Sequence, residues 1–352
     1  ISLKSRLRYY KRKIFKNYFI LGIIFKLPHL IVLSLKFPFK LFFLNRTIKT
    51  VKNNRKIVAV SLTKKIGDII SCEPIVRKIR YDYKESFIIW FTETKYKELI
   101  DENPNVNMVQ GLHCLSEWIL FKYFIKFDMV CDFHFHGKTC CILSIVNDEG
   151  NKEIDHNNYF NFGTLLDIYS LTSGFIPIDH NPKFYIASET IPQADKLKLP
   201  DTYLVIHCES DSKQKGWGKE NWTLLLNFIL NELNLYVVDV GANPKPDLVK
   251  NPNYKNLCGI STLFLTAELI KRASLFIGND SGPAHIANAL DTYGIILMGD
   301  YYHFKNYQPF SGDYFNGNMA TIIRANGYVK NLPVQTVKSF VKDVSKKIIK
   351  KA

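Results

Sequence analysis

The chain has 352 residues and a formal net charge of +15, from 47 Lys and Arg against 32 Asp and Glu. All of this excess lies in residues 1–56, which contain fifteen basic side chains and no acidic one, so the remaining chain is balanced. A diffusely basic nucleic-acid-binding protein is therefore disfavoured, because its body would need excess cations to contact a phosphate backbone. The length favours two domains, since single hydrophobic cores stop growing at about 250–300 residues.

The apolar N-terminal stretch, residues 17–44, is interrupted by lysines and by Pro28 and Pro38, and its longest uncharged run has nine residues. Because a membrane-spanning helix needs about 18 predominantly apolar residues, we do not expect it to span a bilayer. A signal-peptide layout is also missing. Two alternatives remain. The segment lies in the interface of an anionic leaflet, where each cation adds up to about 1 kcal/mol, or it is a helical extension packed on the body or on a partner subunit.

The first half of the body alternates short apolar runs with helical patterns. Residues 57–62 (Ile-Val-Ala-Val-Ser-Leu) are typical of a strand buried on both faces. Residues 69–80 carry a helical pattern with Pro74 near its start. Further strands are predicted at residues 87–91 and 129–133, and a short helix at residues 95–100. Strands alternating with helices indicate a parallel sheet covered on both faces.

A second series of the same kind follows a Pro-rich and polar stretch, residues 176–200, which we interpret as a linker. Strands are predicted at residues 203–207, 235–240, 275–277 and 294–298, and helices at residues 222–233, 263–273 and 286–290. The chain is therefore predicted to form two α/β units with a cleft between them. In such sheets ligands bind beyond the carboxyl ends of the strands, where each motif below falls.

Residues 278–285 (Gly-Asn-Asp-Ser-Gly-Pro-Ala-His) are the best candidate for a binding site. A strand runs into Asp280-Ser281-Gly282, and Pro283 falls where a helix begins, a position that tolerates a missing N–H. Free backbone N–H groups and the positive helix end would bind an anion there. The alternative is that Asp280 or Ser281 only caps the helix while His285 packs in the core.

Two further loops carry candidate residues. Lys215 lies in a Gly-containing loop after the strand that ends at His207, where it could neutralise a diphosphate or simply be solvated. Asp68, in the Gly67-Asp68 pair after the first strand, could cap the following helix or face the cleft as a general base.

Several site classes are disfavoured by missing motifs. The sequence contains neither the Walker-type glycine loop nor Gly-x-Gly-x-x-Gly, His-Glu-x-x-His or Gly-x-Ser-x-Gly. His134 and His136 alternate on a strand-like segment, but no third ligand stands at a useful spacing, so we predict no metal site. The seven cysteines include no Cys-x-x-Cys pair, which favours a reduced, cytosolic compartment and buried thiols.

Five elements, taken in order, carry a family resemblance. They are residues 57–80 with Ile-Gly-Asp and Pro74, residues 127–138 (Phe-Asp-Met-Val-Cys-Asp-Phe-His-Phe-His-Gly-Lys), residues 205–222 with Lys-x-Trp, residues 259–273, and the Gly-Asn-Asp-Ser-Gly-Pro-Ala-His-Ile-Ala that starts at residue 278. Together they resemble the lipopolysaccharide heptosyltransferases of glycosyltransferase family 9. The likeness covers roughly residues 57–345, and its most specific part is the Asp-Ser-Gly-x-x-His element.

The resemblance implies a GT-B fold, an α/β architecture of two Rossmann-like domains whose parallel sheets face a central cleft. A basic, apolar N-terminal extension is added here. The domains are expected to be the extension at residues 1–55, an acceptor domain at 56–190, a nucleotide-sugar domain at 191–330 and a C-terminal helix at 331–352. The family also implies an inverting, metal-independent transferase that uses a nucleotide sugar and no further cofactor.

Residue roles are carried over position by position. Asp68 resembles the general base, and the donor and its diphosphate are expected to contact Lys215, Asp280, Ser281, Gly282, Pro283 and His285. Further donor-binding candidates are His207, Gly241 and Asp247, and acceptor-binding candidates are Lys64, Lys65, His136 and Lys138.

We therefore expect a transferase at the cytoplasmic face of the membrane, which residues 1–55 hold against anionic lipid. It would move a sugar, with ADP-heptose the leading donor, onto a lipopolysaccharide-type glycan, and would bind no nucleic acid. The alternatives are a GT-B-fold sugar-nucleotide epimerase and a non-catalytic protein that binds sugar nucleotides or glycolipids.

Overall fold

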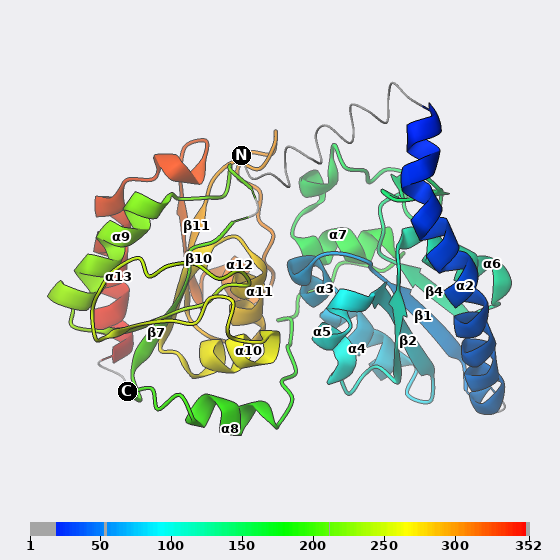
Figure 1. Cartoon of the computed structure of the whole chain (residues 1–352), viewed down its shortest axis with the longest axis horizontal. Helices are drawn as coiled ribbons and strands as arrows, with labels where there is room; N and C mark the ends of the chain where they lie inside the picture. Colours follow the sequence, from blue (N-terminus) through cyan, green and yellow to red (C-terminus); the bar gives the residue numbers. More distant parts are fainter. Residues whose placement is uncertain (1–18, 53–54, 211, 350–352) are drawn as a thin grey trace.

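The computed structural model describes residues 19–52, 55–210 and 212–349, so the cations that precede residue 19 lie outside the described residues. Two α/β halves lie side by side, each built on its own parallel sheet (Figure 1). A chain segment that includes α8 (Thr190–Asp195) joins them.

The first half contains a four-stranded parallel sheet with the order β3-β2-β1-β4, followed by a small antiparallel hairpin, β5-β6. Its strands are β1 (Ile57–Ser61), β2 (Phe87–Glu93), β3 (Met108–Leu112), β4 (Met129–Asp132), β5 (Lys138–Thr139) and β6 (Val146–Asn147). Its helices are α2 (Phe19–Val51), α3 (Ile66–Ser71), α4 (Glu73–Asp82), α5 (Glu98–Asp101), α6 (Leu115–Phe124) and α7 (Leu165–Thr172), with 3-10 turns η1 (Thr94–Tyr96) and η2 (Tyr159–Phe162).

The second half contains a six-stranded parallel sheet with the order β12-β11-β10-β7-β8-β9. Its strands are β7 (Tyr203–His207), β8 (Tyr236–Asp239), β9 (Tyr254–Asn256), β10 (Leu275–Asn279), β11 (Gly294–Met298) and β12 (Ala320–Arg324). Its helices are α9 (Lys219–Asn227), the π-helical turn η3 (Phe228–Glu232), α10 (Leu263–Arg272), α11 (Gly282–Ala289), α12 (Asp313–Asn316), the 3-10 turn η4 (Val329–Asn331) and α13 (Val334–Ile349). Counted from β7, this is the doubly wound order of Rossmann folds.

Successive side chains of a buried strand point to opposite faces of the sheet, and the buried apolar residues accordingly form three clusters. On β7, Leu204 and Ile206 face α9 and α13, whereas Val205 faces the opposite side of the sheet. On β1, Ala59 packs toward α2 and α6, whereas Val60 belongs to the same cluster as Val205. This cluster includes buried residues from both halves, so a continuous apolar core joins them.

Most of the predicted strands are confirmed, and 203–207 and 294–298 match β7 and β11 residue for residue. The predicted helix 69–80 differs. The chain turns helical earlier, at Ile66, and divides at Cys72 into α3 and α4 because Pro74 lacks the N–H that would continue the α3 ladder. The edge strands β3, β9 and β12 and helix α6 were not predicted. Edge strands bury less apolar surface, and their sequence patterns are correspondingly weak.

Helix α2 runs beside α6 along the outer edge of the first half (Figure 1). It continues through both Pro28 and Pro38. Its residues Leu33, Phe37 and Leu44 are buried against the body, together with Ile48, at the spacing of one helical face. This face of α2 therefore packs on the body, which was one of the two alternatives that the sequence left open.

The expectation that the N-terminal segment does not span a bilayer stays a prediction, and one observation bears on it. The helical stretch Phe25–Val51 is long and apolar enough to cross a membrane by length and composition. The sequence analysis counted prolines and lysines as interruptions of the apolar stretch, whereas one continuous helix extends through them.

The two halves meet where α3 and α11 pack against each other. A Cβ on Gly67 would lie 2.8 Å from Nε2 of His285, and a Cβ on Gly282 would lie 3.0 Å from Cβ of Ile66. Each helix therefore presents a glycine to a side chain of the other half, which lets the two helix starts approach closely.

Replacing Gly67 with Ala is expected to destabilise the protein by about 1–3 kcal/mol, because the new methyl group must displace the buried imidazole of His285. The midpoint of thermal unfolding measures the loss. Gly216→Ala is the control, since a Cβ there has its nearest neighbour at 3.7 Å. Equal midpoints for the two variants would contradict the tight α3–α11 contact.

Candidate active site

The candidate residues gather at the switch points of the two sheets, where the strand order reverses. In the first sheet this point lies between β1 and β4, whose carboxyl ends lead to Asp68 and His136. In the second it lies between β7 and β10, which lead to Lys215 and Asp280. Open α/β sheets bind ligands at such points, and here the α3–α11 contact brings the two together.

Asp68 lies in the first turn of α3, directly after β1. Its Oδ2 accepts a long hydrogen bond from the backbone N–H of Lys65 at 3.4 Å, and its Oδ1 accepts one from the hydroxyl of Tyr169 at 2.6 Å. Asp68 can therefore cap α3 and also act in the cleft. A carboxylate offers about four acceptor positions, and these two bonds leave the half-buried group able to accept a proton.

Lys215 and Asp280 form an ion pair across the carboxyl end of the second sheet. The hydroxyl of Tyr307 donates to Oδ2 of Asp280 at 2.6 Å. The ammonium of Lys215 also lies 4.2 Å from the ring centroid of Tyr301 and 5.6 Å from that of Tyr307. Two aromatic rings and a carboxylate thus fix the position of this cation.

Burial alone would raise the pKa of Asp280, but the positive charge of Lys215, with smaller contributions from His285 and Tyr307, holds it below the usual range. The carboxylate is therefore ionised at neutral pH. Burial lowers the pKa of His285, although Asp280 and Asp68 act in the opposite direction. At pH 7 His285 is therefore a neutral hydrogen-bonding group.

His285 lies between the two switch points. Its Nδ1 is 3.5 Å from the hydroxyl of Ser71 in the first half, and its Nε2 is 3.8 Å from Oδ1 of Asp280 in the second. The ring packs on Phe310 at 4.6 Å between centroids. The sequence alternatives for His285, packing or ligand binding, are both compatible with this position.

Ser281 is the N-cap residue of α11, and Gly282 and Pro283 form its first turn. The Ser281 hydroxyl makes no capping bond and instead lies 3.2 Å from Nδ1 of His207 at the end of β7. Burial, with a contribution from Lys245, lowers the pKa of His207 to about 4, so this ring is neutral as well. The structure therefore brings His207 to the start of α11.

The two acceptor candidates on the β1–α3 loop have different surroundings. Nζ of Lys64 forms an ion pair with the carboxylate of Glu93 at 3.3 Å. Burial would lower the pKa of Lys65, but the tyrosine Tyr301 and the carboxylates of Asp68 and Asp280 outweigh it and raise the pKa. Lys65 is therefore a charged group that faces both switch points.

The candidates after β4 lie at the rim of the first half. Nζ of Lys138 is 2.7 Å from Nε2 of His156, and burial together with Lys64 and Lys65 lowers the pKa of this lysine. Nδ1 of His136 is buried and has no hydrogen-bond partner among the described residues. Lys65, Lys138 and His156 thus lie near Asp68, whose negative charge acts on the pKa of each of them.

His134, which alternates with His136, has a structural role. Its Nδ1 donates to Asp132 at 2.6 Å, and its Nε2 accepts the backbone N–H of Thr63 at 3.1 Å. Burial would raise the pKa of Asp132, but His134 and Lys122 hold it well below the usual value. Both ring nitrogens are in use, and they fix the loop that leads from β1 to Asp68.

The remaining donor candidates lie further along the second sheet. Gly241 follows β8, and a Cβ there would lie 3.0 Å from Cδ of Glu209, so this glycine gives room to a carboxylate. Asp247 is exposed and accepts a bond from Asn256 within its own loop at 3.0 Å. In the described part of the chain, Asp247 forms no hydrogen bond or ion pair with Lys215 or Asp280. Within residues 19–52, 55–210 and 212–349, no group of three or more His, Cys, Asp or Glu could hold a metal ion.

Sequence reasoning missed Tyr169, Tyr301 and Tyr307. Tyr169 lies inside α7, where nothing in the pattern distinguishes it from a core aromatic residue. The other two belong to the aromatic run Tyr301-Tyr302-His303-Phe304 and its continuation after β11. Their position beyond the carboxyl end of a predicted strand was a signal that could have identified them.

Two Rossmann-like halves with facing switch points have the GT-B architecture of glycosyltransferases, which confirms the predicted fold class. Residues 179–309 match the model of glycosyltransferase family 9 (heptosyltransferase). Lipopolysaccharide heptosyltransferase 1 of Campylobacter coli is 22% identical over an alignment of 299 positions, and the match covers 71% of this chain and 85% of the relative.

Two solved structures are similar to this chain at a TM-score of 0.63. One is a glycosyl transferase family 9 protein from Veillonella parvula DSM 2008, 16% identical, with 83% of this chain and 98% of that chain covered. The other is ADP-heptose lps heptosyltransferase II of E. coli, 15% identical, with 83% and 99% covered. Residues 179–309 therefore match a glycosyltransferase family 9 domain, and this match together with the curated relative supports the expected family resemblance and a glycosyltransferase.

Replacing Lys215 with Met is expected to cost about 3–5 kcal/mol of stability at neutral pH, because it leaves the buried carboxylate of Asp280 unpaired. In the wild type the lowered pKa stabilises the fold at neutral pH, and this contribution is lost as the pH falls through the folded-state pKa. In the variant, burial raises the pKa of Asp280 because Lys215 no longer opposes it. The loss of stability relative to the wild type should therefore be smaller at pH 5 than at pH 8. Urea unfolding at both pH values measures it.

The double variant Lys215→Met, Asp280→Asn is the control for this experiment. It removes the unpaired charge and should recover most of the lost stability at pH 8. A deficit that is the same at pH 5 and pH 8, and that persists in the double variant, would show that Lys215 acts through packing alone.

Proposed function

We propose that this glycosyltransferase transfers a sugar, with a heptose as the leading candidate, from a nucleotide-activated donor to a lipopolysaccharide-type glycan, with inversion at the anomeric carbon. The observation that carries the proposal is the convergence of Asp68 from one half and Lys215, Asp280 and His285 from the other at the α3–α11 contact. A base and a leaving-group site on opposite walls suit an in-line displacement.

In the proposed reaction the acceptor hydroxyl oxygen forms a bond to the anomeric carbon while its proton passes to Asp68. The hydrogen bond from Tyr169 orients the carboxylate, so that its remaining lone pairs face the acceptor. Lys65 and Lys138 lie near Asp68 and, with the candidate His136, would hold the acceptor by its polar or anionic groups.

The bond that breaks joins the anomeric carbon to the donor's diphosphate, which leaves with the electron pair. Lys215 supplies positive charge, the neutral ring of His285 can donate one hydrogen bond, and the start of α11 adds its positive helix end. We propose that these groups stabilise the leaving group without a metal and that the enzyme needs no cofactor besides its nucleotide-sugar co-substrate.

The choice of donor and acceptor is supported by the relatives. The Campylobacter coli relative is a lipopolysaccharide heptosyltransferase, and the E. coli structure is an ADP-heptose heptosyltransferase. ADP-heptose is therefore the first donor to test. A thermal-shift screen of nucleotide sugars would identify the base and the sugar, because a bound ligand raises the unfolding midpoint in proportion to its affinity.

The Asp68→Asn variant is expected to lose transfer by at least about 100-fold, because the amide cannot accept the acceptor proton. Donor binding should stay within about twofold, since the donor contacts lie on the other half. Transfer of labelled sugar to extracted glycolipid measures the first quantity and calorimetry the second. Asp343→Asn, at an exposed position of α13, is the matched control.

The outcomes of this experiment separate the alternatives. Full transfer by Asp68→Asn would refute the assignment of the base. Conversion of the donor without any acceptor would identify an epimerase instead of a transferase. Donor binding by the wild type with no turnover on any glycolipid would identify a non-catalytic binding protein.

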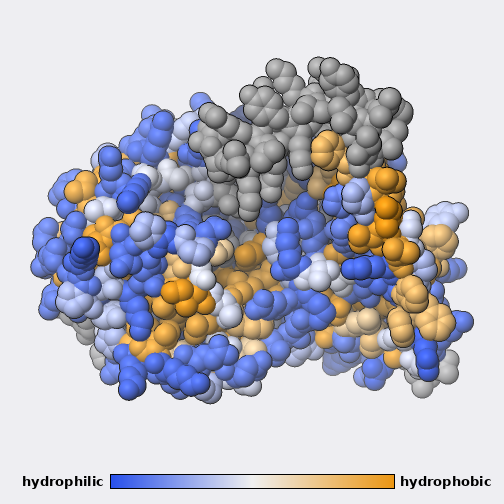
Figure 2. Space-filling view, viewed as in Figure 1, coloured by the Kyte–Doolittle hydropathy of each residue, from blue (hydrophilic) through white to orange (hydrophobic). Residues whose placement is uncertain are grey.

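We also propose that α2 lies in the surface of an anionic leaflet, on the cytoplasmic side where the nucleotide sugar is made available. Opposite its buried face, Leu35, Phe39, Phe42 and Phe43 are 61–69% exposed. Figure 2 shows hydrophobic residues gathered along this edge of the molecule, over α2. Contiguous exposed apolar surface of this kind marks an interaction site.

Charge favours lipid as the occupant of this face. The helix carries Lys26, Lys36, Lys40, Arg46 and Lys49 and no acidic residue. A second copy of the same helix would bring these like charges together, whereas an anionic leaflet complements them. The face that packs on the body, including the 2.8 Å Lys40–Glu117 ion pair, supports a helix lying along the surface over one that crosses the bilayer.

Replacing Leu35, Phe39, Phe42 and Phe43 together with Ser is expected to lower the partition onto vesicles of 30% phosphatidylglycerol in phosphatidylcholine by at least about tenfold, because apolar area no longer enters the lipid. Co-sedimentation measures it, and raised salt should weaken wild-type binding. The matched control replaces the exposed Tyr81, Ile176, Ile260 and Phe340 with Ser. Unchanged sedimentation, or a dimer lost in the α2 variant by analytical ultracentrifugation, would overturn lipid binding.

A further inference from the structure

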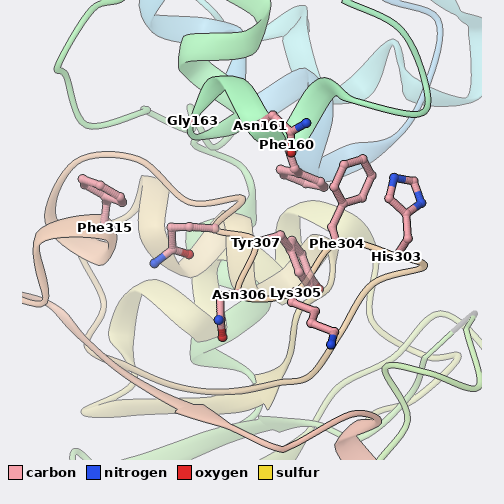
Figure 3. Close-up of a pocket in the computed structure, with 10 residues that line it drawn as sticks. Phe160, Asn161, Gly163, His303, Phe304, Lys305, Asn306, Tyr307 and Phe315 are labelled. Carbon is pink, nitrogen blue, oxygen red and sulfur yellow. The ribbon is translucent and has the colours of Figure 1, made fainter.

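A cavity of about 270 Å³ lies between the two halves, beside the reaction groups. The first half contributes Phe160 and Asn161 of η2 and the nearby Gly163, and the second contributes the segment from His303 to Gln308 and Phe315 of α12. Figure 3 shows the rings of Phe160, Phe304 and Tyr307 close together, with the ring of Phe315 apart from them. Neither the family resemblance nor the mechanism proposed above uses this cavity.

One wall of the cavity belongs to the leaving-group site. Tyr307 lines the cavity, and its hydroxyl donates to Asp280 while its ring lies 5.6 Å from the ammonium of Lys215. The opposite wall leads to the base. Phe160 contacts Tyr159 at 4.4 Å between centroids, and Tyr159 contacts Phe135, which stacks on Tyr169, the partner of Asp68. An occupant of the cavity would therefore border the leaving-group site at Tyr307 and be connected to the base through this series of ring contacts.

The lining combines aromatic rings with hydrogen-bonding groups. Phe160 meets Phe304 at 5.4 Å and Tyr307 at 4.9 Å between centroids, which gives a firm apolar wall. Oε1 of Gln308 is buried without a hydrogen-bond partner among the described residues, and an unpaired buried acceptor favours a ligand that donates to it. Aromatic walls with a few polar groups are typical of small-ligand sites. A sugar suits such a site, because it can lie against an aromatic ring while its hydroxyl groups bond to the polar groups.

Charge narrows the class of ligand. Lys305 is exposed at the cavity and forms no salt bridge within the described residues, and no acidic side chain belongs to the lining. An unpaired cation at a site of this kind favours an anionic substituent on the ligand. The cavity volume lies just below the range of about 300–1,000 Å³ that holds drug-sized ligands, so it suits a single sugar residue.

We propose that this cavity, walled by Phe160, Phe304, Tyr307 and Phe315, is a subsite for one anionic sugar residue of the acceptor glycan, whose carboxylate or phosphate pairs with Lys305. The proposal rests on the proposed function for the presence of a glycan acceptor. An acceptor is favoured over the donor because both halves line the cavity, whereas the donor is expected on the second half alone. His303, which donates to the backbone carbonyl of Asn157 at 2.6 Å, closes the cavity across the two halves.

The test uses Lys305→Gln and Phe315→Ala in the full chain, since both side chains are exposed and their loss should leave the fold intact. The acceptor probe is delipidated core oligosaccharide from a strain that lacks this enzyme. Each variant should raise the KM for this acceptor roughly tenfold, while kcat and the donor KM stay within about twofold. Lys342→Gln and Phe340→Ala, exposed on α13, are the matched controls.

A second acceptor, the same oligosaccharide after removal of its phosphates, identifies the anion. If phosphate is the partner, Lys305→Gln loses its effect on this acceptor, and if a carboxylate is the partner, the effect remains. Both results support the subsite. An acceptor KM that neither variant changes, or a donor KM that rises instead, would overturn it.

Direct binding keeps the subsite testable if the proposed function fails. Saturation-transfer NMR with the untreated oligosaccharide should show contact with the wild type and a roughly tenfold weaker affinity for Phe315→Ala, whether or not turnover occurs. Wild-type binding that Phe315→Ala and Lys305→Gln both leave unchanged would refute the subsite. A wild type that binds but never transfers would refute only the transferase.

Discussion

The close approach of α3 and α11 is the contact on which the site depends. Gly67 leaves room for the imidazole of His285, and Gly282 leaves room for the side chain of Ile66, so two helix starts from different sheets lie against each other. Each helix follows a switch-point strand of its own sheet. Because the strands fix the helices and the glycines fix their separation, the position of Asp68 relative to Asp280 follows from backbone packing and needs no long side chain to bridge the halves.

Buried charge is balanced locally on both sides of this contact. Asp280 is compensated by Lys215, Tyr307 and His285, and Asp132 by His134 and Lys122. Each network holds a loop after a switch-point strand: one contains the diphosphate candidates, and the other leads to Asp68. A buried ion pair contributes little net stability compared with apolar packing, but removing one partner is costly. Such pairs therefore suit sites where a loop must keep one geometry while its ligands come and go.

The sequence predicted the parts of the fold that rest on strong local patterns. The buried strands of both sheets carry continuous β-branched runs, and residues 278–285 carry the strand-to-helix turn. The parallel sheets, covered by helices on both faces, followed from strand–helix alternation. A helical extension packed on the body was one of two alternatives for α2, and the sequence could not choose between them because a composition test ignores the body against which the helix packs.

The site was predictable only where a residue stands next to a strand end. Asp68, Lys215 and Asp280 follow such ends, so their types and positions pointed to the cleft. Tyr169 reaches Asp68 across 101 positions of sequence, from the middle of a helix, and its role depends on tertiary packing that no local pattern encodes. The ion pair of Lys215 with Asp280 is hidden for the same reason, since each residue alone is an ordinary loop residue.

The distribution of charge gives the two halves different tasks. The excess of basic residues belongs to the N-terminal extension, and its described helix, α2, packs on the first half only, at the edge away from the second (Figure 1). If this edge lies on an anionic leaflet as proposed, the half that carries Asp68 faces the lipid-linked acceptor. The second half, with Lys215 and the start of α11, stays toward the solution from which a nucleotide sugar arrives. The confinement of the excess basic residues to one end of the sequence would thus let the two substrates approach from different sides and meet at the α3–α11 contact.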